Sequence, residues 1–466
     1  MTRTRRFSLV ALSIIALSPA PAAASGYLAA RFGSDHGTPA MANPYAVYFN
    51  PAAMGGATGT QLTLDASIAL RKASYTRSDA ALSASNADVA SDPAYRSANT
   101  GKADLSNVLA LPYLGAISDL GTKNFRLGYA VYVPFGGMAS WSKTSNADPV
   151  YADGPQRWQV IEGKILAIHN TIAVAYTFEQ PRLTIGANFS VVLNQIDTVR
   201  ARNANGSDDT TTSTGGLVEG RSHVTASGVD LGAGLGVYWE PKADRSVRLG
   251  ASYTFAPGFG ETRWKGKLTQ QFGGSREQAT SADVDFLQRW PDVARLGGVF
   301  VASKAVELRA DAEYVRWSVF ERQCVVAPGA QCDVNADGSQ PGKDVILNVP
   351  RKWQDAIGLR AGVGYFLRPE LELFGSLGMT SPAVPKSHID PSTIDNYRII
   401  YALGARWEAT PKFALAGSFN HSYMLPVDTD GAVGVNAYKP PSRSPSSDGK
   451  YTQQIFFLNV NGTVKF

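Results

Sequence analysis

The stretch Val306–Tyr314 reads Val-Glu-Leu-Arg-Ala-Asp-Ala-Glu-Tyr, and its residues alternate between apolar and charged types. A period of two residues is that of a β-strand whose two faces differ. A row of Glu, Arg, Asp and Glu side chains cannot face hydrocarbon, because charge in lipid is costly. We therefore expect the charged row to line an interior where neighbouring strands can pair it. The apolar row can face lipid, so the stretch favours a strand of a transmembrane β-barrel.

The same alternation recurs along the chain, and we expect about fourteen antiparallel strands. Clear further examples are Gln61–Tyr75, Phe125–Val133 and Ile357–Tyr365. Many stretches run for ten residues or more, and a tilted membrane strand needs about 9–11. The expected strands lie at 61–77, 105–118, 124–134, 158–178, 182–204, 221–240, 246–264, 293–302, 305–321, 351–367, 370–380, 396–409, 412–424 and 451–466.

The links between these strands alternate in length, as in bacterial outer-membrane barrels. Short links such as 179–181 and 368–369 alternate with long polar ones at 78–104, 203–220, 265–290, 322–350 and 425–450. The last stretch alternates up to Phe466. A final strand that ends in Phe resembles the assembly signal of outer-membrane barrels. The alternative is a strand of a soluble sandwich.

The N-terminus reads as a secretory signal. Arginines at positions 3, 5 and 6 precede the apolar run Phe7–Leu17, and Ala22–Ala24 offers a small-residue cleavage site. We expect residues 1–24 to be removed, the alternative being an uncleaved N-terminal helix. The mature chain then has 41 basic against 39 acidic residues. This near balance gives no basic stripe for nucleic acid, so no nucleic-acid partner is expected.

The composition excludes two further classes. Of the 466 residues 44% are hydrophobic and 18% are charged, which is too apolar for a disordered chain. Beyond the signal no apolar run reaches the length of about 18 residues that a membrane-spanning helix needs.

Several short segments carry a family resemblance. They are Asn50-Pro51-Ala52-Ala53, Val133-Pro134-Phe135-Gly136, Ile172–Tyr176, Gly228–Gly232, Arg316-Trp317-Ser318 and Ser381–Pro385. In their order and spacing they resemble the FadL/TodX group of outer-membrane transporters for hydrophobic compounds, also called long-chain fatty-acid transport proteins. The resemblance covers essentially the whole mature chain.

The resemblance implies a fold and a transport route. Residues 61–466 would form a fourteen-stranded barrel in the bacterial outer membrane, and residues 25–60 a plug in its lumen. Outer loops would capture an apolar ligand, which would reach an inner pocket and leave sideways into membrane lipid beside a kinked strand. Uptake would need no ATP and no cofactor, and the protein would be a monomer.

The substrate stays open between several classes. Long-chain fatty acids are the expected substrates, and aromatic hydrocarbons are the alternative. A lipid hydrolase is a reading of another class, but none of the five histidines has a partner at ligand spacing, and His421 falls on the outward row. A water-filled porin is a third reading, which the plug segment argues against.

Candidate site residues follow from the motifs. The plug motif is Asn50, Pro51 and Ala52, which otherwise would form an ordinary turn. The strand break and lateral gate would be Val133, Pro134, Phe135 and Gly136, because Pro cannot pair within a central strand. The alternative there is a simple strand end.

Exposed apolar residues in the third loop suggest ligand capture, although packing of the loop on itself would also explain them. They are Met138, Trp141, Val150, Tyr151 and Trp158. A fatty-acid carboxylate would need a cation in a pocket of low dielectric. We consider Arg157 near the loop, and Arg126 and Arg309 among the inward arginines, most of which we expect to pair with wall acids.

One loop combines a disulfide with a calcium-like motif. Cys324 and Cys332 suit a single local disulfide in an exported protein. Asp333, Asn335, Asp337 and Asp344 have the spacing of a calcium loop. No helical pattern flanks them and the twelfth position is Asp rather than Glu, so a polar turn is the alternative.

Overall fold

The computed structural model describes residues 32–142, 153–211, 218–271, 279–335, 341–429, 431 and 444–466. The expected signal sequence, residues 1–24, lies outside these residues. The strands are β1 Thr60–Arg77, β2 Gly101–Ser118, β3 Phe125–Ser140, β4 Glu162–Phe178, β5 Leu183–Arg202, β6 Gly220–Trp239, β7 Val247–Thr254, β8 Glu261–Gln271, β9 Thr280–Arg289, β10 Val293–Val301, β11 Val306–Val315, β12 Arg322–Val326, β13 Val345–Pro350, β14 Ala356–Arg368, β15 Leu371–Thr380, β16 Arg398–Thr410, β17 Phe413–Asp428 and β18 Gly449–Lys465.

The helices are short and lie in the plug, in the loops and at breaks in strands. The α-helices are α1 Ala46–Phe49, α2 Ala87–Ser91 and α3 Pro93–Asn99. The 3-10 helices are η1 Ser34–His36, η2 Pro51–Gly56, η3 Asp79–Ala81, η4 Pro155–Trp158, η5 Pro257–Phe259, η6 Trp317–Val319 and η7 Lys386–His388. Among the described residues, no helix is both long enough and apolar enough to cross a membrane.

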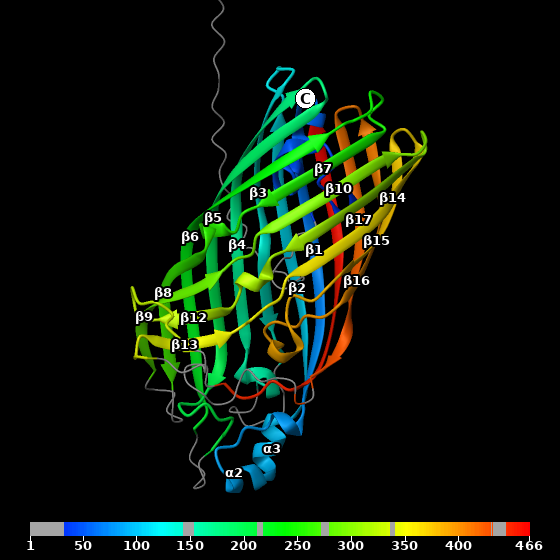
Figure 1. The fold of residues 1–466 in the computed structure, drawn as a ribbon. Helices are drawn as coiled ribbons and strands as arrows, with labels where there is room; N and C mark the ends of the chain where they lie inside the picture. Colours follow the sequence, from blue (N-terminus) through cyan, green and yellow to red (C-terminus); the bar gives the residue numbers. More distant parts are fainter. Residues whose placement is uncertain are drawn as a thin grey trace, which may run out of the picture.

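The strands form one closed antiparallel barrel (Figure 1). Its wall has fourteen strand positions, and we call each of them a stave. Four staves are interrupted and consist of two strands each, namely β7 with β8, β9 with β10, β11 with β12, and β13 with β14. β1 pairs with both β2 and β18, which closes the ring. The expected fold class is therefore confirmed, and short turns gather at one end and long loops at the other.

The prediction of two long loops was wrong, because both segments contain strands. Residues 265–290 contain the end of β8 and all of β9, and residues 322–350 contain β12 and β13. The outward row of this part of the wall is charged: Lys265 lies opposite Asp285, and Lys267 opposite Asp283. An apolar outward row is required only at the depth of the hydrocarbon, so strands that extend beyond the membrane lose that signal.

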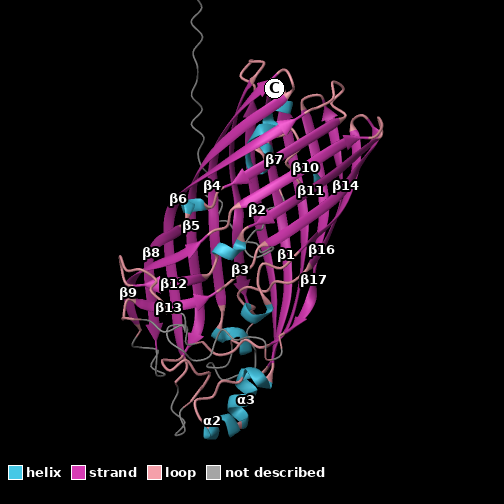
Figure 2. Cartoon of the chain, in the orientation of Figure 1, coloured by secondary structure: helices cyan, strands magenta, loops and turns pink. Residues whose placement is uncertain are grey.

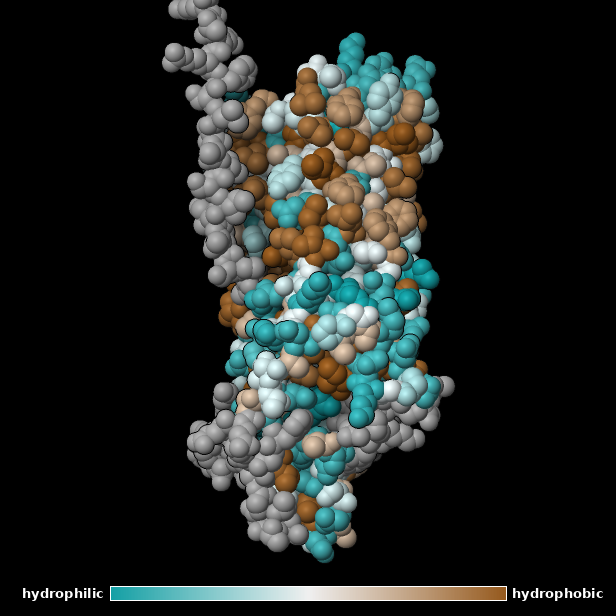
Figure 3. All heavy atoms as spheres, turned by 90° about the vertical axis from the view of Figure 1, so that its left-hand side faces the viewer, coloured by the Kyte–Doolittle hydropathy of each residue, from teal (hydrophilic) through white to brown (hydrophobic). Residues whose placement is uncertain are grey.

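The two faces of the wall differ as the alternation predicts. Leu308 and Tyr314 of β11 are 45% and 40% exposed, whereas Glu307 and Arg309, on either side of Leu308, are buried. Figure 3 shows an apolar belt at the end with short turns and a polar surface towards the long loops. Inside, the expected ion pairs form: Arg360 bonds Asp311 at 2.8 Å.

Residues 32–59 fill the lumen near the end with short turns, where Figure 2 shows short helices inside the barrel. Plug residues from Phe32 to Ala57 form an apolar cluster with wall residues such as Tyr113 and Tyr132. Glycines in the wall make room for the plug. A Cβ on Gly236 would lie 1.9 Å from Asn50 Oδ1, and one on Gly250 would lie 2.0 Å from the Pro39 carbonyl oxygen.

Candidate functional site

The wall between β2 and β3 is interrupted. The two strands pair from Ser118 opposite Leu127 up to Tyr113 opposite Tyr132, and then separate. They meet again only at the bridge between Leu105 and Trp141. Within the described strands, Ser106–Pro112 of β2 and Val133–Ser140 of β3 have no pairing with each other. We call this interruption the lateral window.

The window results from a bulge that turns β3 inwards. Two residues, Val133 and Pro134, stand in β3 where the ladder with β4 has only one, because Tyr132 faces His169 and Phe135 faces Ala167. Proline has no N–H for the ladder, and an extra residue bends a strand. The usual alternation of burial ends here, and residues 132–137 are all buried. The expected gate residues, Val133 to Gly136, thus lie at the kink.

The plug reaches the edge of the window that lies nearer the short turns. The ring of Phe32 lies 5.1 Å from that of Tyr113 and 5.9 Å from that of Tyr132. The Tyr113 hydroxyl also donates to the Pro44 carbonyl at 2.6 Å. The first described residue of the chain is therefore packed against the last paired position of β2 and β3.

The expected plug motif ties the plug to itself and to the wall. Asn50 is fully buried and caps η2 by accepting a hydrogen bond from the Ala52 amide. Its Nδ2 group donates to the Pro39 carbonyl at 2.8 Å and to the Val237 carbonyl of β6 at 3.0 Å. Pro51 occupies the first turn of η2, where a missing N–H costs nothing.

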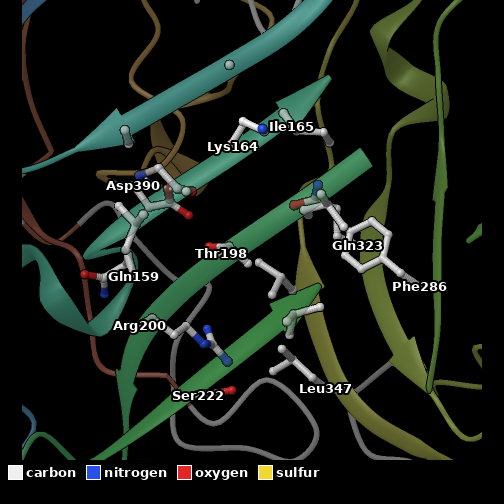
Figure 4. A pocket seen from close by; sticks show the side chains of 18 of the residues that line it. Gln159, Lys164, Ile165, Thr198, Arg200, Ser222, Phe286, Gln323, Leu347 and Asp390 are labelled. Carbon is white, nitrogen blue, oxygen red and sulfur yellow. Dashed lines mark hydrogen bonds between the residues drawn. The ribbon is translucent and has the colours of Figure 1, made fainter. Parts of the chain in front are cut away.

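A cavity of about 110 Å³ lies in the lumen towards the long loops (Figure 4). We call it the lumen cavity. Strands from opposite parts of the wall line it with apolar side chains, which include Ile165, Ile196, Val224, Phe286 and Leu347. Gly137 and Met138 of the kinked part of β3 also line it, so the cavity borders the lateral window.

The lining of the lumen cavity is rich in cations. It includes Arg71, Lys164, Arg200 and Arg351, with Asp390 as its acidic residue. Asp390 is already bonded to Arg351 at 2.8 Å. Arg200 is 8% exposed and donates through Nη1 to Ser444 at 3.2 Å. Among the described residues, its Nη2 has no hydrogen-bond partner.

The three arginines expected to bind a carboxylate lie elsewhere. Arg157 is fully buried between loops, where Nε bonds both carboxylate oxygens of Glu219 at 3.0 Å. Arg126 donates to the Ala57 carbonyl at the plug end. Arg309 is paired with Glu307 and Glu372 near the short turns. None of the three lines the lumen cavity. Arg200 was not among the predicted arginines. It lies four residues after inward-facing Ile196 on β5, so the alternation of the strand also directs it inwards.

The residues expected to capture a ligand are mostly packed. Trp158 is fully buried and donates through Nε1 to Asn99 at 2.8 Å, and Trp141 is 4% exposed. Val150 and Tyr151 lie outside the described residues. Met138 packs on an apolar cluster of Ala69, Leu109, Leu111, Ile455 and Phe457 on the inner wall. It therefore lies between the cluster and the lumen cavity.

Aromatic rings line the lumen beside the kink. Phe135 stacks on Trp290 at 5.1 Å, and Trp290 lies 6.1 Å from Trp264. Trp317 meets Phe135 edge to face and Trp353 at 4.8 Å. We call these five side chains the aromatic cluster. Phe135 comes from β3 and Trp264 from β8, and the other three lie at the breaks between β9 and β10, β11 and β12, and β13 and β14.

The expected disulfide joins Cys324 of β12 to Cys332 in the loop after this strand. Of the four residues expected to bind calcium there, Asp337 lies outside the described residues. Asp333, Asn335 and Asp344 are described, and the described part of the chain contains no group of three or more acidic, His or Cys residues that could hold a metal ion.

A closed antiparallel barrel of this kind, with an N-terminal segment packed in its lumen and an interruption between two of its strands, belongs to the class of transmembrane β-barrel channels. A family model described as outer membrane protein transport protein (OMPP1/FadL/TodX) matches residues 21–431. The chain belongs to this family, whose members carry hydrophobic compounds through outer-membrane barrels.

Solved structures of low sequence identity share the fold. A Pseudomonas aeruginosa FadL homologue superposes with a TM-score of 0.71 at 16% identity, over 96% of this chain and 98% of that one. The Pseudomonas putida toluene transporter TodX gives 0.64 at 14% identity, over 96% and 99%. The Ralstonia pickettii toluene transporter TbuX gives 0.60 at 14%, over 95% and 98%. No curated protein matches the sequence significantly.

Proposed function

We propose that this protein takes up hydrophobic compounds passively across the outer membrane and that long-chain fatty acids are its main substrates. The charge of the lumen cavity is the observation that supports the fatty acid. Among the described residues, four cations line a mostly apolar space, and the acidic side chain beside them, Asp390, is already paired. A guanidinium with a free N–H in such a place suits a carboxylate, since charge-assisted hydrogen bonds strengthen where water is excluded.

Apolar side chains extend from this cavity towards the lateral window. The cavity of about 110 Å³ is smaller than the roughly 150 Å³ that hold one benzene ring, so it can take a head group but must widen for more. Met138 links it to the apolar cluster of Ala69, Leu109 and Leu111 beside the lateral window. Through the window the acyl chain would enter membrane hydrocarbon without passing through water, which makes the last step favourable.

Aromatic hydrocarbons are the second candidate. The aromatic cluster supports them, because offset and edge-to-face ring contacts would suit a flat apolar ligand next to Phe135 and Trp290. Two of the solved structures with this fold are toluene transporters. The cations of the lumen cavity would be without use for such a ligand, and this favours the fatty acid.

Direct binding to the purified barrel in detergent separates the two. Oleate, oleyl alcohol and toluene would be titrated against the wild type, Arg200→Met, and the matched control Arg322→Met, whose side chain is 33% exposed beside Glu321. We expect oleate to bind more tightly than the alcohol, and Arg200→Met to weaken oleate alone by roughly 10- to 100-fold, since a hydrogen bond to a charged group contributes about 1.5–3 kcal/mol.

Equal binding of oleate and oleyl alcohol, or binding of toluene alone, would assign the channel to hydrocarbons. Two further assays address the other classes. A porin would pass sugars through proteoliposomes, and a lipid hydrolase would release fatty acid from phospholipid. We expect neither.

A further inference from the structure

The lateral window has a buried polar residue near each of its two ends. Asn107 of β2 is 3% exposed, between the exposed residues Ser106 and Val108, so its side chain points inwards within the window. His169 of β4 is also 3% exposed and faces Tyr132 directly before the bulge. In the described part of the chain, Asn107 Oδ1 and His169 Nε2 have no hydrogen-bond partner.

Such atoms need an explanation. A buried donor or acceptor without a partner carries the full cost of its lost hydration, and nearly all such groups in native proteins are satisfied by protein, water or ligand. Neither residue is forced into place by apolar packing alone, since Leu or Phe would fill these positions without an orphaned polar atom. Their position beside a break in the wall, rather than in a closed core, points to a passing ligand.

The ring of His169 is fixed by its neighbours. It stacks on Tyr132 at 5.3 Å and lies 6.3 Å from Phe135, so it is held between the kink and the edge of the window nearer the short turns. Asn107 lies opposite Arg71, a residue that also lines the lumen cavity. The two polar atoms therefore lie on the strands on either side of kinked β3. Asn107 is at the level of Ala139 and His169 at the level of Tyr132, so they are at opposite ends of the window.

We propose that Asn107 and His169 are two polar contacts at opposite ends of the lateral window, together called the polar station. Each in turn hydrogen-bonds the hydroxyl-bearing head of a departing amphiphile, a protonated carboxylic acid or an alcohol. This inference rests on the proposed function. The Asn107 Oδ1 atom can only accept a hydrogen bond, so it suits an O–H group and not a carboxylate. The His169 Nε2 atom can accept or donate according to its tautomer.

The station complements the cations of the lumen cavity. An ionised carboxylate cannot enter hydrocarbon at low cost, so a fatty acid must take up a proton from water before it leaves the window. Arg200 would hold the ionised head in the cavity, and the station would hold the neutral head at the exit. Fatty alcohols would use only the station, and alkanes would use neither.

The test compares three compounds that share one chain of sixteen carbons: palmitic acid, hexadecanol and hexadecane. Their labelled forms would be taken up by cells that lack their own transporter and carry the wild type, Asn107→Leu, His169→Phe, His169→Gln or the control His421→Phe. His421 lies on the outward face, where it stacks on Phe456 at 4.4 Å. Heat-shifted mobility on gels would confirm that each barrel is folded.

We expect Asn107→Leu and His169→Phe to slow uptake of the acid and the alcohol about 3- to 10-fold, as for the loss of one neutral hydrogen bond, and to leave hexadecane within about twofold. His169→Gln keeps a donor and an acceptor and should restore most of the rate. Equal slowing of all three compounds, or no slowing at all, would overturn the station. If the wild type takes up none of the compounds above the level of empty cells, the proposed function itself fails.

Discussion

Tyr113 and Tyr132 face each other at the last paired position of β2 and β3, and their rings stack with centroids 5.8 Å apart. Phe32 of the plug packs on both rings. The edge of the lateral window nearer the short turns is thus made by the wall and the plug together. A movement of the plug's first described residue would change the packing at the window directly.

Deleting Pro134 should close the lateral window. The deletion removes the one extra residue between the pairs Tyr132–His169 and Phe135–Ala167, so β3 could continue straight and pair with β2. We expect uptake of oleate by cells to fall at least about tenfold, because release needs the window. Binding in detergent should stay within about threefold, since Arg200 is untouched.

The two measurements give the deletion its own control. Pro369→Ala, in the turn between β14 and β15, changes a proline away from the window and should leave both measurements unchanged. Full uptake by a deletion variant whose β2 and β3 amides are newly protected from exchange would show that ligands leave by another route.

Replacing Asn50 should loosen the plug. Asn50→Leu leaves the carbonyls of Pro39 and Val237 without their donor, and Asn50→Asp sets a carboxylate against both. Each orphaned buried group costs about 1–3 kcal/mol. We expect higher ion conductance in planar bilayers for both variants and for Gly236→Val, whose side chain would clash with Asn50.

The control for the plug is Asn86→Leu in the loop helix α2, where the asparagine also caps a helix but is away from the lumen. Its conductance should equal that of the wild type. If the ion conductance of Asn50→Leu equals that of the wild type, these hydrogen bonds do not hold the plug.

Much of the barrel could be predicted because the lipid fixes the outward face. The stretches Val306–Tyr314 of β11 and Ile357–Tyr365 of β14 alternate throughout. Their large apolar residues, such as Leu308 and Leu359, are exposed on the outer face, as the pattern requires. The pattern failed for β9 and β12, where the wall extends beyond the hydrocarbon and charged side chains face outwards. The breaks in the four interrupted staves were not predicted either, and Trp290 and Trp317, which lie at two of them, contact other rings inside the lumen.

The buried ion pair between Arg77 and Asp208 should help to hold the outer loops in place. Arg77 and Asp208 are both fully buried and 2.7 Å apart, and Asp208 also accepts from the Tyr95 hydroxyl at 2.5 Å. Arg77→Met leaves the carboxylate buried without its cation, which typically costs about 3–5 kcal/mol. We expect faster hydrogen exchange in residues 79–100. Arg96→Met, in an exposed pair with Asp79, should change little.

The double variant Arg77→Met, Asp208→Asn completes this test, because it removes the orphaned charge. Exchange in the loop should then return part of the way to that of the wild type. Equal exchange in Arg77→Met and Arg96→Met would show that the buried pair does not hold the loops.

Acid should weaken the loop that holds Asp390. Burial, together with the cations Lys352 and Arg351, lowers the pKa of His388 to about 4, against about 6.5 in an unfolded chain. The undocked loop therefore binds a proton more readily than the docked loop. Docking should weaken as the pH falls from about 6.5 to about 4 and change no further below that range.

Hydrogen exchange in residues 386–395, corrected for the intrinsic effect of pH, measures this directly. His388→Gln cannot titrate and should lose the part of the dependence that falls between these two pH values. A wild type and a His388→Gln variant with the same pH profile would show that another group is responsible.

The candidate site was less predictable than the wall. The plug motif and the kink could be predicted because Asn50 and Pro134 have backbone properties that need no distant partner. The carboxylate site could not, because the roles of Arg157 and Arg200 depend on residues far apart in sequence. Glu219 forms an ion pair with Arg157, whereas no described residue is a hydrogen-bond partner of Arg200 Nη2.

A reversible link across the lateral window tests the central claim most directly. Met138 packs on the cluster that contains Leu109, so cysteines at these two positions can be joined by a short, cleavable thiol cross-linker. We predict that linked Leu109→Cys, Met138→Cys protein takes up oleate no faster than empty cells and recovers when the link is cleaved, while each single variant and the wild type, with its own disulfide, are unaffected. Unchanged uptake through the linked barrel would contradict release of the ligand through this wall.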